Sequence, residues 1–600
     1  MPSETRAGRV VRDPVHGYVE VPDELDQLVR CAAVQRLRNI SQNSLAQAAF
    51  PSMTGTRYEH ALGTMHLARR AWHHSWRNAV APRGTEQAQV HHAFRLAVID
   101  DLRSSVADDP DVDSCTAALV AGPSAVETPL WADFVHCIGV VVAAIGLVHD
   151  LGHPPYSHTM EPFYEQHIDE IFGPDARSEF DSYRARSASH AQFHEWAGLQ
   201  LFDTIPDAVF TRVPRTLVRT VLADRSASGW AHCLHAIIDG QFDVDRLDYL
   251  MRDALNSGTE YGSIDATRLL HSLELHRVGP HDGDGDRWRI GLGARAVSSF
   301  ETLLIQRAQH YRWVVHHASV VAAELSLQRC AAMLLALCRR EDISRLPPMP
   351  DLDYLAASRT DSAQACVDDH GFLMWLRSAR PALDAHLADH PDEGIRKCLT
   401  LLDVLDTFEV TPVPAWRNYQ EYQARAEQND AAVQSLIREL PVAPIPDYVS
   451  NRASTEAVTV LAADVPARLN AAIDRILRRV ADNGGLPAVE ARLTREVPVV
   501  PSCGSGFWLV AEVPFRGMKE DVANIWRGSE QALLSDVSPY PIALAAIEIM
   551  RPRYQVFFVP FAAKPGEAST QQRREVGRLF LEQIASWHDV SSLIPAMTSE

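Results

Sequence analysis

The sequence lacks three features that would quickly suggest a class: a Cys-x-x-Cys motif, a long apolar run and an excess of positive charge. Its nine cysteines are scattered along 600 residues, so we expect neither a zinc ribbon nor a disulfide framework. No segment approaches eighteen uninterrupted apolar residues, and the first residues are polar, so we expect a cytoplasmic protein that does not enter a membrane. The net charge of −20 disfavours duplex DNA as a partner. A small anionic substrate remains compatible, because a metal and a few arginines can focus positive charge inside an acidic protein.

The length of the chain predicts two or three domains, since one core seldom holds so many residues. Apolar residues recur at helical spacing over 23–77 and 134–342, and strand-like runs follow at 507–513 and 554–560, with a helix at 574–587. We therefore expect a mostly α fold with a smaller α+β region at its C-terminal end. Pro-rich joints interrupt the pattern at 346–350, 411–415 and 441–446. A turn-like insertion is expected over 82–133, and a hairpin tip at 279–286. The insertion holds one amphipathic segment near 91–103.

The stretch 145–158 places chemically active side chains at the end of an apolar helix. His149 and Asp150 end the apolar run, and a Gly/Pro turn then carries His153 and His158. Burying imidazole and carboxylate costs free energy unless a partner compensates, and a divalent metal accepts both as ligands. The His-Asp dipeptide occurs twice more in the chain, so this pair alone is equally compatible with a helix cap.

Two further segments carry polar side chains at helical spacing. Arg57 and His60 are three residues apart after a Pro/Gly turn and would share one face of a helix. The segment 243–253 holds four aspartates, which are weak helix formers. Its polar residues on one helical side are Asp245, Tyr249, Arg252 and Asp253. Taken singly, these segments also fit a core histidine beside a surface arginine and a salt-bridged helix surface.

Together the segments supply one complete set of metal ligands. The set comprises two imidazoles and two carboxylates: His60, His149, Asp150 and Asp245. It suits one octahedral Mn²⁺, Fe²⁺ or Mg²⁺ with positions left for water and a substrate oxygen. A structural zinc site would be closed and would more often use cysteine. Arg57 and Arg246 carry planar donors suited to phosphate, and three histidines are candidates for proton transfer, namely His153, His158 and His194.

In their order and spacing these motifs resemble the HD-domain deoxynucleoside triphosphate triphosphohydrolases, which include bacterial dGTPase-like enzymes and the vertebrate sterile-alpha-motif/HD enzyme. The matching motifs are R-x-x-H at 57–60, H-D-L-G-H-x-P-x-S-H at 149–158 and D-x-D-R-x-D-Y-x-x-R-D at 243–253. The resemblance implies an HD-type catalytic domain over 1–345. The Pro-rich joints and the later change of pattern predict a helical region over 346–480 and an α+β region over 481–600. The resemblance also implies one divalent metal per site, a tetramer or hexamer, and a nucleotide effector.

The resemblance further implies a reaction and a role for each site residue. Water attacks the α-phosphorus of a deoxynucleoside triphosphate and releases the deoxynucleoside and tripolyphosphate, in nucleotide-pool control or anti-phage defence. The implied metal ligands are His60, His149, Asp150 and Asp245. The implied contacts to the triphosphate and sugar are Gln42, Arg57, Arg246, Tyr249, Asp253 and Arg307. The implied catalytic residues are His153 by the α-phosphate, His158, and His194 as general acid with Glu195 orienting it.

The chain departs from the family pattern at three positions. Asn43 follows Gln42 where Leu-Gly is frequent, which concerns discrimination at the sugar. Arg30 aligns with an acidic residue that reads guanine in members activated by GTP, so we do not expect GTP activation there, although Arg38 remains available to an activator's phosphates. Val315 stands where some members carry a substrate-contacting tyrosine.

Two other functional classes remain open from the sequence. One is another HD phosphohydrolase that acts on a nucleoside monophosphate, a cyclic nucleotide or a single-stranded DNA end. The other is a nucleotide-sensing scaffold without turnover, against which the complete ligand set argues.

Overall fold

The computed structural model describes most of the chain in two compact units. The described residues are 9–81, 86–106, 114–121, 134–186, 192–224, 229–240, 242–278, 287–343, 346, 368–406, 411–428, 430–438, 440, 442–444, 456–481, 484–513, 524–527, 530–541, 543–544, 550–562 and 568–592. Unit 1 contains those within Met1–His310, Pro350–Leu373 and Lys519–Ser538. Unit 2 contains those within Tyr311–Met349, Met374–Met518 and Pro539–Glu600. The expected hairpin tip at 279–286, most of the expected joint at 346–350 and much of the insertion lie outside the described residues.

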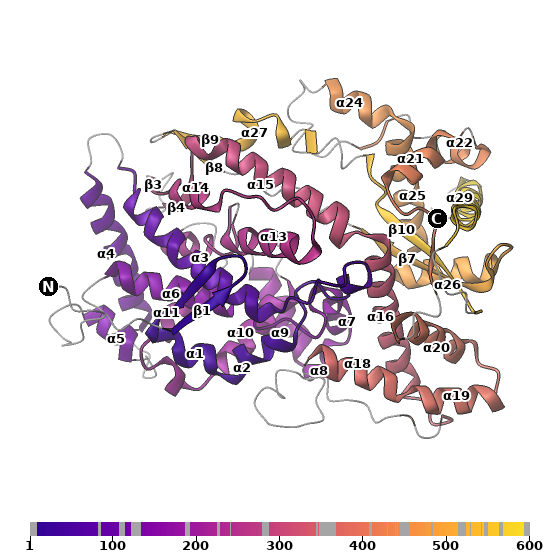
Figure 1. The fold of residues 1–600 in the computed structure, drawn as a ribbon, viewed down its shortest axis with the longest axis horizontal. Coiled ribbons are helices and arrows are strands. Elements are labelled where there is room, and N and C mark those ends of the chain that lie inside the picture. The colour runs from indigo at the N-terminus through magenta and orange to yellow at the C-terminus, as the bar shows by residue number, and fades with distance from the viewer. Residues whose placement is uncertain are drawn as a thin grey trace, which may run out of the picture. The chain divides into compact units, whose positions relative to one another are not determined.

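Unit 1 is mostly helical and opens with a hairpin. Its first strands are β1 (Arg9–Asp13) and β2 (Gly17–Val21), which pair antiparallel. Its helices are α1 (Asp26–Arg30), α2 (Ala32–Arg36), α3 (Arg57–Arg77), α4 (Gln87–Val106), α5 (Ser114–Ala121), α6 (Phe134–Val148), α7 (Glu161–Gln166), α8 (Ile168–Phe172), α9 (Ala176–Arg186), α10 (Phe193–Asp203), α11 (Arg215–Leu222), α12 (Trp230–His235), α13 (Val244–Ser257), α14 (Ala266–His271), α15 (Val297–His310) and α27 (Leu534–Val537). Helix α3 packs against both α6 and α13 (Figure 1), so the three motif-bearing segments meet.

A second sheet in unit 1 joins strands that are distant in sequence. Its order is β3 (Leu273–Val278), β4 (Arg287–Gly293), β8 (Asn524–Arg527) and β9 (Glu530–Leu533). Neighbouring strands pair antiparallel except for β4 and β8, which are parallel. Residues near position 525 therefore belong with unit 1, which holds the His- and Asp-bearing motifs, and not with the C-terminal strands.

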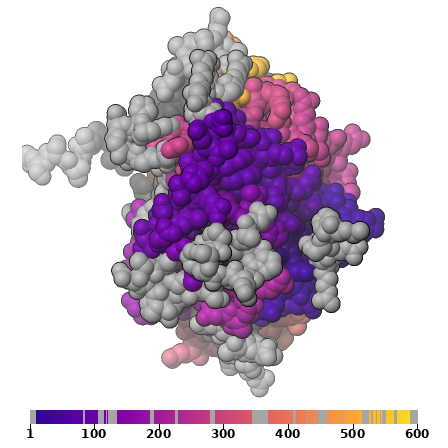
Figure 2. All heavy atoms as spheres, turned by 90° about the vertical axis from the view of Figure 1, so that its left-hand side faces the viewer, coloured from indigo at the N-terminus to yellow at the C-terminus, as the bar shows by residue number. Residues whose placement is uncertain are grey.

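The described part of the insertion is helical and lies on the surface of unit 1. Helix α4 contains the predicted amphipathic segment, and its apolar residues Val90, Phe94, Val98 and Leu102 recur every fourth position and are buried. Figure 2 shows the face of unit 1 that carries α4, drawn in violet. Helix α4 of the insertion is thus held on unit 1 by burying a single apolar stripe.

Unit 2 combines helices with a four-stranded antiparallel sheet. Its helices are α16 (Ala318–Leu337), α19 (Arg380–Asp389), α20 (Glu393–Asp406), α21 (Tyr419–Glu427), α22 (Ala431–Ile437), α24 (Glu456–Ala463), α25 (Val465–Ala481), α26 (Gly485–Glu496) and α29 (Thr570–Ser592). The sheet order is β5 (Val413–Pro414), β10 (Tyr554–Pro560), β7 (Gly504–Glu512) and β6 (Val499–Val500). The predicted strands at 507–513 and 554–560 and the predicted C-terminal helix are present, and the mostly α fold is confirmed.

Helix α16 is the one described helix long and apolar enough to span a membrane, and 67% of its most apolar window is buried. Such burial is typical of a helix in a protein core.

The three domains expected from the sequence stay a prediction, and the two compact units divide the chain at other positions. Helix α16 groups with unit 2, where it packs against α20, although the first domain was expected to reach 345. A single apolar core also runs from Val413 to Trp587 across the boundary expected at 480. Strand pairing and shared cores join residues hundreds of positions apart, and composition along the chain carries no sign of them.

Candidate active site

The site begins where α6 ends and a turn packs directly on α10. Helix α6 is buried on nearly all sides, so its end places His149 and Asp150 inside unit 1. At Gly152 a Cβ atom would lie 2.0 Å from the carbonyl oxygen of His194 and 2.1 Å from the backbone nitrogen of Gly198. Only glycine allows this approach, which sets His194 beside the His-Asp motif.

The structure brings the four expected metal ligands together from α3, α6 and α13. His60 Nε2 lies 2.8 Å from Asp245 Oδ1 and 3.7 Å from Asp150 Oδ2. His149 Nε2 lies 3.3 Å from Asp150 Oδ1 and 3.7 Å from Asp245 Oδ1. Both Nε2 atoms are buried and form no hydrogen bond of good geometry with the described residues. Buried acceptors of this kind are expected where a cation binds, so the residues present fit one divalent metal.

The partners of the two imidazoles fix which nitrogen faces the metal position. His149 Nδ1 lies 2.9 Å from the carbonyl oxygen of Gly146, and His60 Nδ1 lies 2.8 Å from a carboxylate oxygen of Asp248. Both partners can only accept, so the imidazole proton sits on Nδ1 and donates to them. The Nε2 lone pairs are then left for a metal, the usual arrangement at a metal-binding histidine.

Asp248 is a site residue that sequence reasoning missed. Besides His60 it accepts hydrogen bonds from His16 at 2.6 Å and from Arg252 at 2.9 Å. Arg252 in turn donates to Asp13 at 2.9 Å. Burial would raise the pKa of Asp248, but Arg252 holds it well below its usual range. The carboxylate therefore stays charged and fixes the ring of His60. Its position three residues after Asp245 on α13 was the available signal.

The charges at the ligand set favour a bound cation. Burial opposes a charge on His60, yet the close carboxylates of Asp245 and Asp248 raise its pKa to about 10. Burial would raise the pKa of Asp150, but the adjacent Arg57 guanidinium holds it well below its usual range. The site thus holds a proton strongly when no metal is bound, and a divalent metal competes with that proton.

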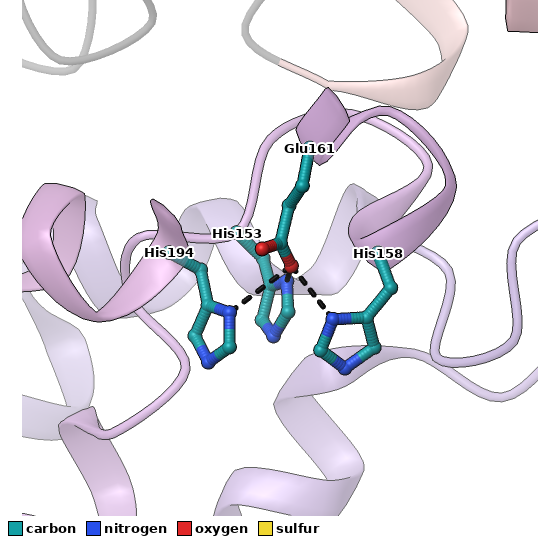
Figure 3. Close-up of side chains that lie close together, drawn as sticks. All are labelled: His153, His158, Glu161 and His194. Carbon is teal, nitrogen blue, oxygen red and sulfur yellow. Dashed lines mark hydrogen bonds and ion pairs between the residues drawn. The ribbon is translucent and has the colours of Figure 1, made fainter. Parts of the chain in front are cut away.

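A second cluster lies beside the ligands and is centred on Glu161 (Figure 3). One carboxylate oxygen of Glu161 lies 2.6 Å from Nδ1 of His158, 3.0 Å from that of His194 and 3.4 Å from that of His153. The opposite nitrogen of His153 lies 3.2 Å from Asp150 Oδ1. His153 therefore stands between the two clusters, while His158 is exposed.

The pKa values of His153 and His194, two members of this cluster, are shifted in opposite directions. Burial and then the nearby Arg57 lower the pKa of His153 to about 3. For His194 burial opposes the charge, but Glu161 outweighs it and raises the pKa. The His194 imidazole therefore keeps its proton to higher pH than the neighbouring His153 imidazole does, which is compatible with the acid role expected of His194.

The Glu161 cluster is better described by hydrogen bonds than by a second metal. Its four ligand atoms lie within 4.8 Å of one another, a spacing also compatible with an ion. However, the rings of His153 and His194 are stacked, with centroids 4.0 Å apart and planes 14° apart. An imidazole lone pair lies in the plane of its ring, so the lone pairs of two stacked rings lie in separate, nearly parallel planes, whereas the ligands of one ion must converge on it.

The carboxylate that orients His194 is Glu161, in place of the expected Glu195. Glu195 accepts the backbone N–H of Gln192 at 3.3 Å in the capping box that starts α10. A capping residue serves the helix end, so the sequence motif placed the right pair of residues on α10 but assigned the wrong partner to the imidazole. Glu161 stands three residues after His158, and this spacing could have indicated it.

The arginines expected at the phosphates differ in their contacts. Arg57 donates to Asp150 at 2.7 Å, to the Ser157 hydroxyl at 3.0 Å and to the Gln42 carbonyl oxygen at 3.4 Å. It therefore lies beside the ligands, with Gln42 next to it. Arg246 pairs with the N-cap residue of α13, Asp243, at 3.0 Å.

Three of the expected substrate residues gather around His310 at the end of α15. Its ring lies 5.7 Å from that of Tyr249, and its Nε2 lies 3.5 Å from Asp253 Oδ2. Arg307 stands one turn earlier on the same helix and is buried. Burial raises the pKa of Asp253 to about 7. Burial and then Arg307 lower the pKa of His310 to about 3. The sequence analysis assigned no role to His310.

Comparison with known proteins gives distant similarities. No family model matches the chain. An uncharacterized protein of Methanocaldococcus jannaschii is 25% identical over 352 residues, 58% of this chain and 55% of that protein. A deoxynucleoside triphosphate triphosphohydrolase of Dictyostelium discoideum is 25% identical over 164 residues, 27% of this chain and 22% of that protein. The chain thus spans about half the length of the first relatives it matches.

A solved structure shares the fold over nearly the whole chain. It is a phosphohydrolase from Bacteroides thetaiotaomicron, with a TM-score of 0.50 and 17% identity, covering 92% of this chain and 99% of that chain. The chain is therefore similar in fold to a phosphohydrolase and in sequence to a dNTP triphosphohydrolase.

Proposed function

We propose that the protein is a metal-dependent HD-type phosphohydrolase and that its substrate is a deoxynucleoside triphosphate. The observation that carries the proposal is the ligand set, in which two imidazoles direct buried Nε2 atoms toward the carboxylates of Asp150 and Asp245. Such a set suits Mn²⁺, Fe²⁺ or Mg²⁺. The similarity to the Dictyostelium enzyme supports the substrate class.

The metal would be held by His60, His149, Asp150 and Asp245. When bound, it would supply a Lewis acid for a phosphoryl oxygen and a more acidic water. Arg57 lies against Asp150, where its remaining N–H groups suit the oxygens of a triphosphate. Tyr249, Asp253 and Arg307, grouped around His310, then bind the sugar and the far phosphates.

In the proposed reaction His194 supplies the proton for the leaving group. Water attacks the α-phosphorus, and the bond between that phosphorus and the sugar 5′-oxygen breaks. His194 Nδ1 is held by Glu161, so the proton given to the departing oxygen comes from Nε2, and the proton lost by the water restores the acid. The products are the deoxynucleoside and tripolyphosphate.

Product analysis tests the proposal directly. Purified protein is incubated with each of the four dNTPs, singly and in pairs, with Mn²⁺, Fe²⁺ or Mg²⁺. Tripolyphosphate and free deoxynucleoside are expected in equal amounts. Orthophosphate or pyrophosphate alone would show a different phosphohydrolase, and turnover that appears only with paired nucleotides would show a nucleotide effector.

A further inference from the structure

The turn that carries His153 and His158 has an unfavourable backbone conformation. Tyr156 and Ser157 are consecutive residues with φ of 59° and 52°, and neither is glycine. Side chains disfavour this left-handed region, so it persists only where surrounding contacts impose it. Some neighbouring group must therefore hold the turn in place.

Asp369, at the start of α18 (Asp369–Ser378), provides such contacts. One oxygen of its carboxylate accepts the backbone N–H of Tyr156 at 2.6 Å. The other accepts the backbone N–H of Ser41 at 2.9 Å and also the Ser41 hydroxyl. All three residues belong to unit 1. A carboxylate with two accepting oxygens can hold two chain segments at once.

These contacts continue to the metal ligands. The Ser157 hydroxyl donates to the Ser41 carbonyl oxygen at 2.7 Å and accepts from Arg57 at 3.0 Å. Arg57 in turn donates to the metal ligand Asp150 at 2.7 Å. A continuous hydrogen-bonded path therefore connects Asp369 to the site, although Asp369 follows Asp150 by more than two hundred residues.

The start of α18 has a separate residue for its own cap. Asp368 accepts the backbone N–H of Gly371 at 2.8 Å, which satisfies a helix-end donor. The two adjacent aspartates thus have different partners: Asp368 bonds within its own segment, whereas the bonds of Asp369 all reach other segments. Phe372 adds a ring contact to Tyr156, with centroids 6.2 Å apart.

We infer that Asp369 is a positioning residue for the proposed hydrolysis. By holding Tyr156 and Ser41, it keeps the 153–158 turn in the conformation that aims His153 and His158 at the substrate and Ser157 at Arg57. The inference rests on the proposed function for its catalytic consequence. The restraint on the turn can be measured without any substrate.

Two measurements on the full-length protein test the inference, with Asp369→Ala compared with Asp368→Ala. The first is backbone hydrogen exchange of the segment 153–158. Exchange is expected to speed up in D369A and to remain at the wild-type rate in D368A. The second is steady-state hydrolysis with metal content measured in parallel. D369A is expected to lose about ten- to a hundredfold in kcat, because misplacement by an ångström can cost that much, with bound metal unchanged and KM changed less than kcat.

Asp369→Asn refines the test, because it keeps one accepting oxygen and loses the other. It is expected to restore part of the protection of the Tyr156 amide and part of kcat. Wild-type exchange at 153–158 in D369A would overturn the inference, as would a loss of kcat no greater than that of D368A. If the wild-type protein hydrolyses no phosphate ester but exchange accelerates only in D369A, the proposed function fails while the restraint on the turn stands.

Discussion

Asp248 determines how His60 is presented to a metal, because its carboxylate can only accept a hydrogen bond. The His60 Nδ1 proton is committed to it at 2.8 Å, and the buried Nε2 is left bare. The same carboxylate balances Arg252, which is almost fully buried. One side chain thus serves both the ligand geometry and the charge balance of unit 1.

Replacing Asp248 with Asn should weaken metal binding by roughly ten- to a hundredfold, the usual loss when the partner of a metal-binding histidine is changed. Titration calorimetry with Mn²⁺ measures this. Asp13→Asn is the matched control, because Asp13 also pairs with Arg252 at 2.9 Å but lies outside the ligand contacts described above. Equal affinity in the two variants would contradict the role assigned to Asp248.

The pKa of His194 predicts the alkaline limb of the pH profile. Glu161 raises that pKa against the effect of burial, so the acid form persists to higher pH than in a free imidazole and is lost as pH rises through the raised value. In Glu161→Gln the raising charge is gone, and the alkaline limb of kcat/KM should move to lower pH.

Glu195→Gln is the control for that profile. Glu195 caps α10 and acts on His194 only as a more weakly contributing charge, so its variant should shift the limb less. A limb that moves equally in both variants would contradict the assignment of Glu161 as the partner of His194.

The sequence indicates which residues form the site better than it indicates which of them are hydrogen-bonded to one another. His149, Asp150 and the turn histidines lie in one short motif, and the structure brings them together with His60 and Asp245. The partners Asp248 and Glu161 were missed because a hydrogen bond depends on how helices rotate against one another. His60 and Asp248, for instance, are 188 residues apart on different helices. Spacing within one segment could place Asp248 near Asp245 and Glu161 near His158, but it could not show which side chain of another helix each would meet.

At the scale of elements, the close approach of the 151–153 turn to α10 controls the site. A Cβ atom at Gly152 would overlap two backbone atoms of α10, whereas one at Gly198 would come no nearer than 3.4 Å to the turn. The two glycines face each other across one contact, yet only the first is sterically required. The sequence predicted both the helices and the turn but not this asymmetry.

Gly152→Ala should therefore destabilise unit 1 by about 1–3 kcal/mol, the usual cost of forcing an extra methyl group into a packed contact. Gly198→Ala is expected to be neutral or slightly stabilising, since alanine favours a helix over glycine. Urea unfolding followed by circular dichroism measures both. Equal stability of the two variants would show that the turn yields to the added methyl group.

At the scale of the whole molecule, the proposed metal site belongs to one of two units. Its ligands lie on α3, α6 and α13 of unit 1, while a separate apolar core organises much of unit 2. The spacing of apolar residues predicted the mostly α fold but not this division, because β8 joins unit 1 by pairing with β4 more than two hundred residues earlier. The two units can therefore respond differently to ligand.

Metal binding should stabilise unit 1 more than unit 2. A ligand that binds only the folded state adds about 2.7 kcal/mol at a hundred times its dissociation constant, so Mn²⁺ should raise the unfolding midpoint of unit 1 and a chelator should reverse the rise. Pulse proteolysis with mass spectrometry assigns each transition to its peptides. His149→Ala, which removes a ligand, should abolish the rise, whereas Asp26→Asn, at an exposed pair with Arg30, should retain it. A rise that persists in the His149 variant would place the metal outside the proposed ligand set, and one shared equally by both units would show that they unfold as a single cooperative body.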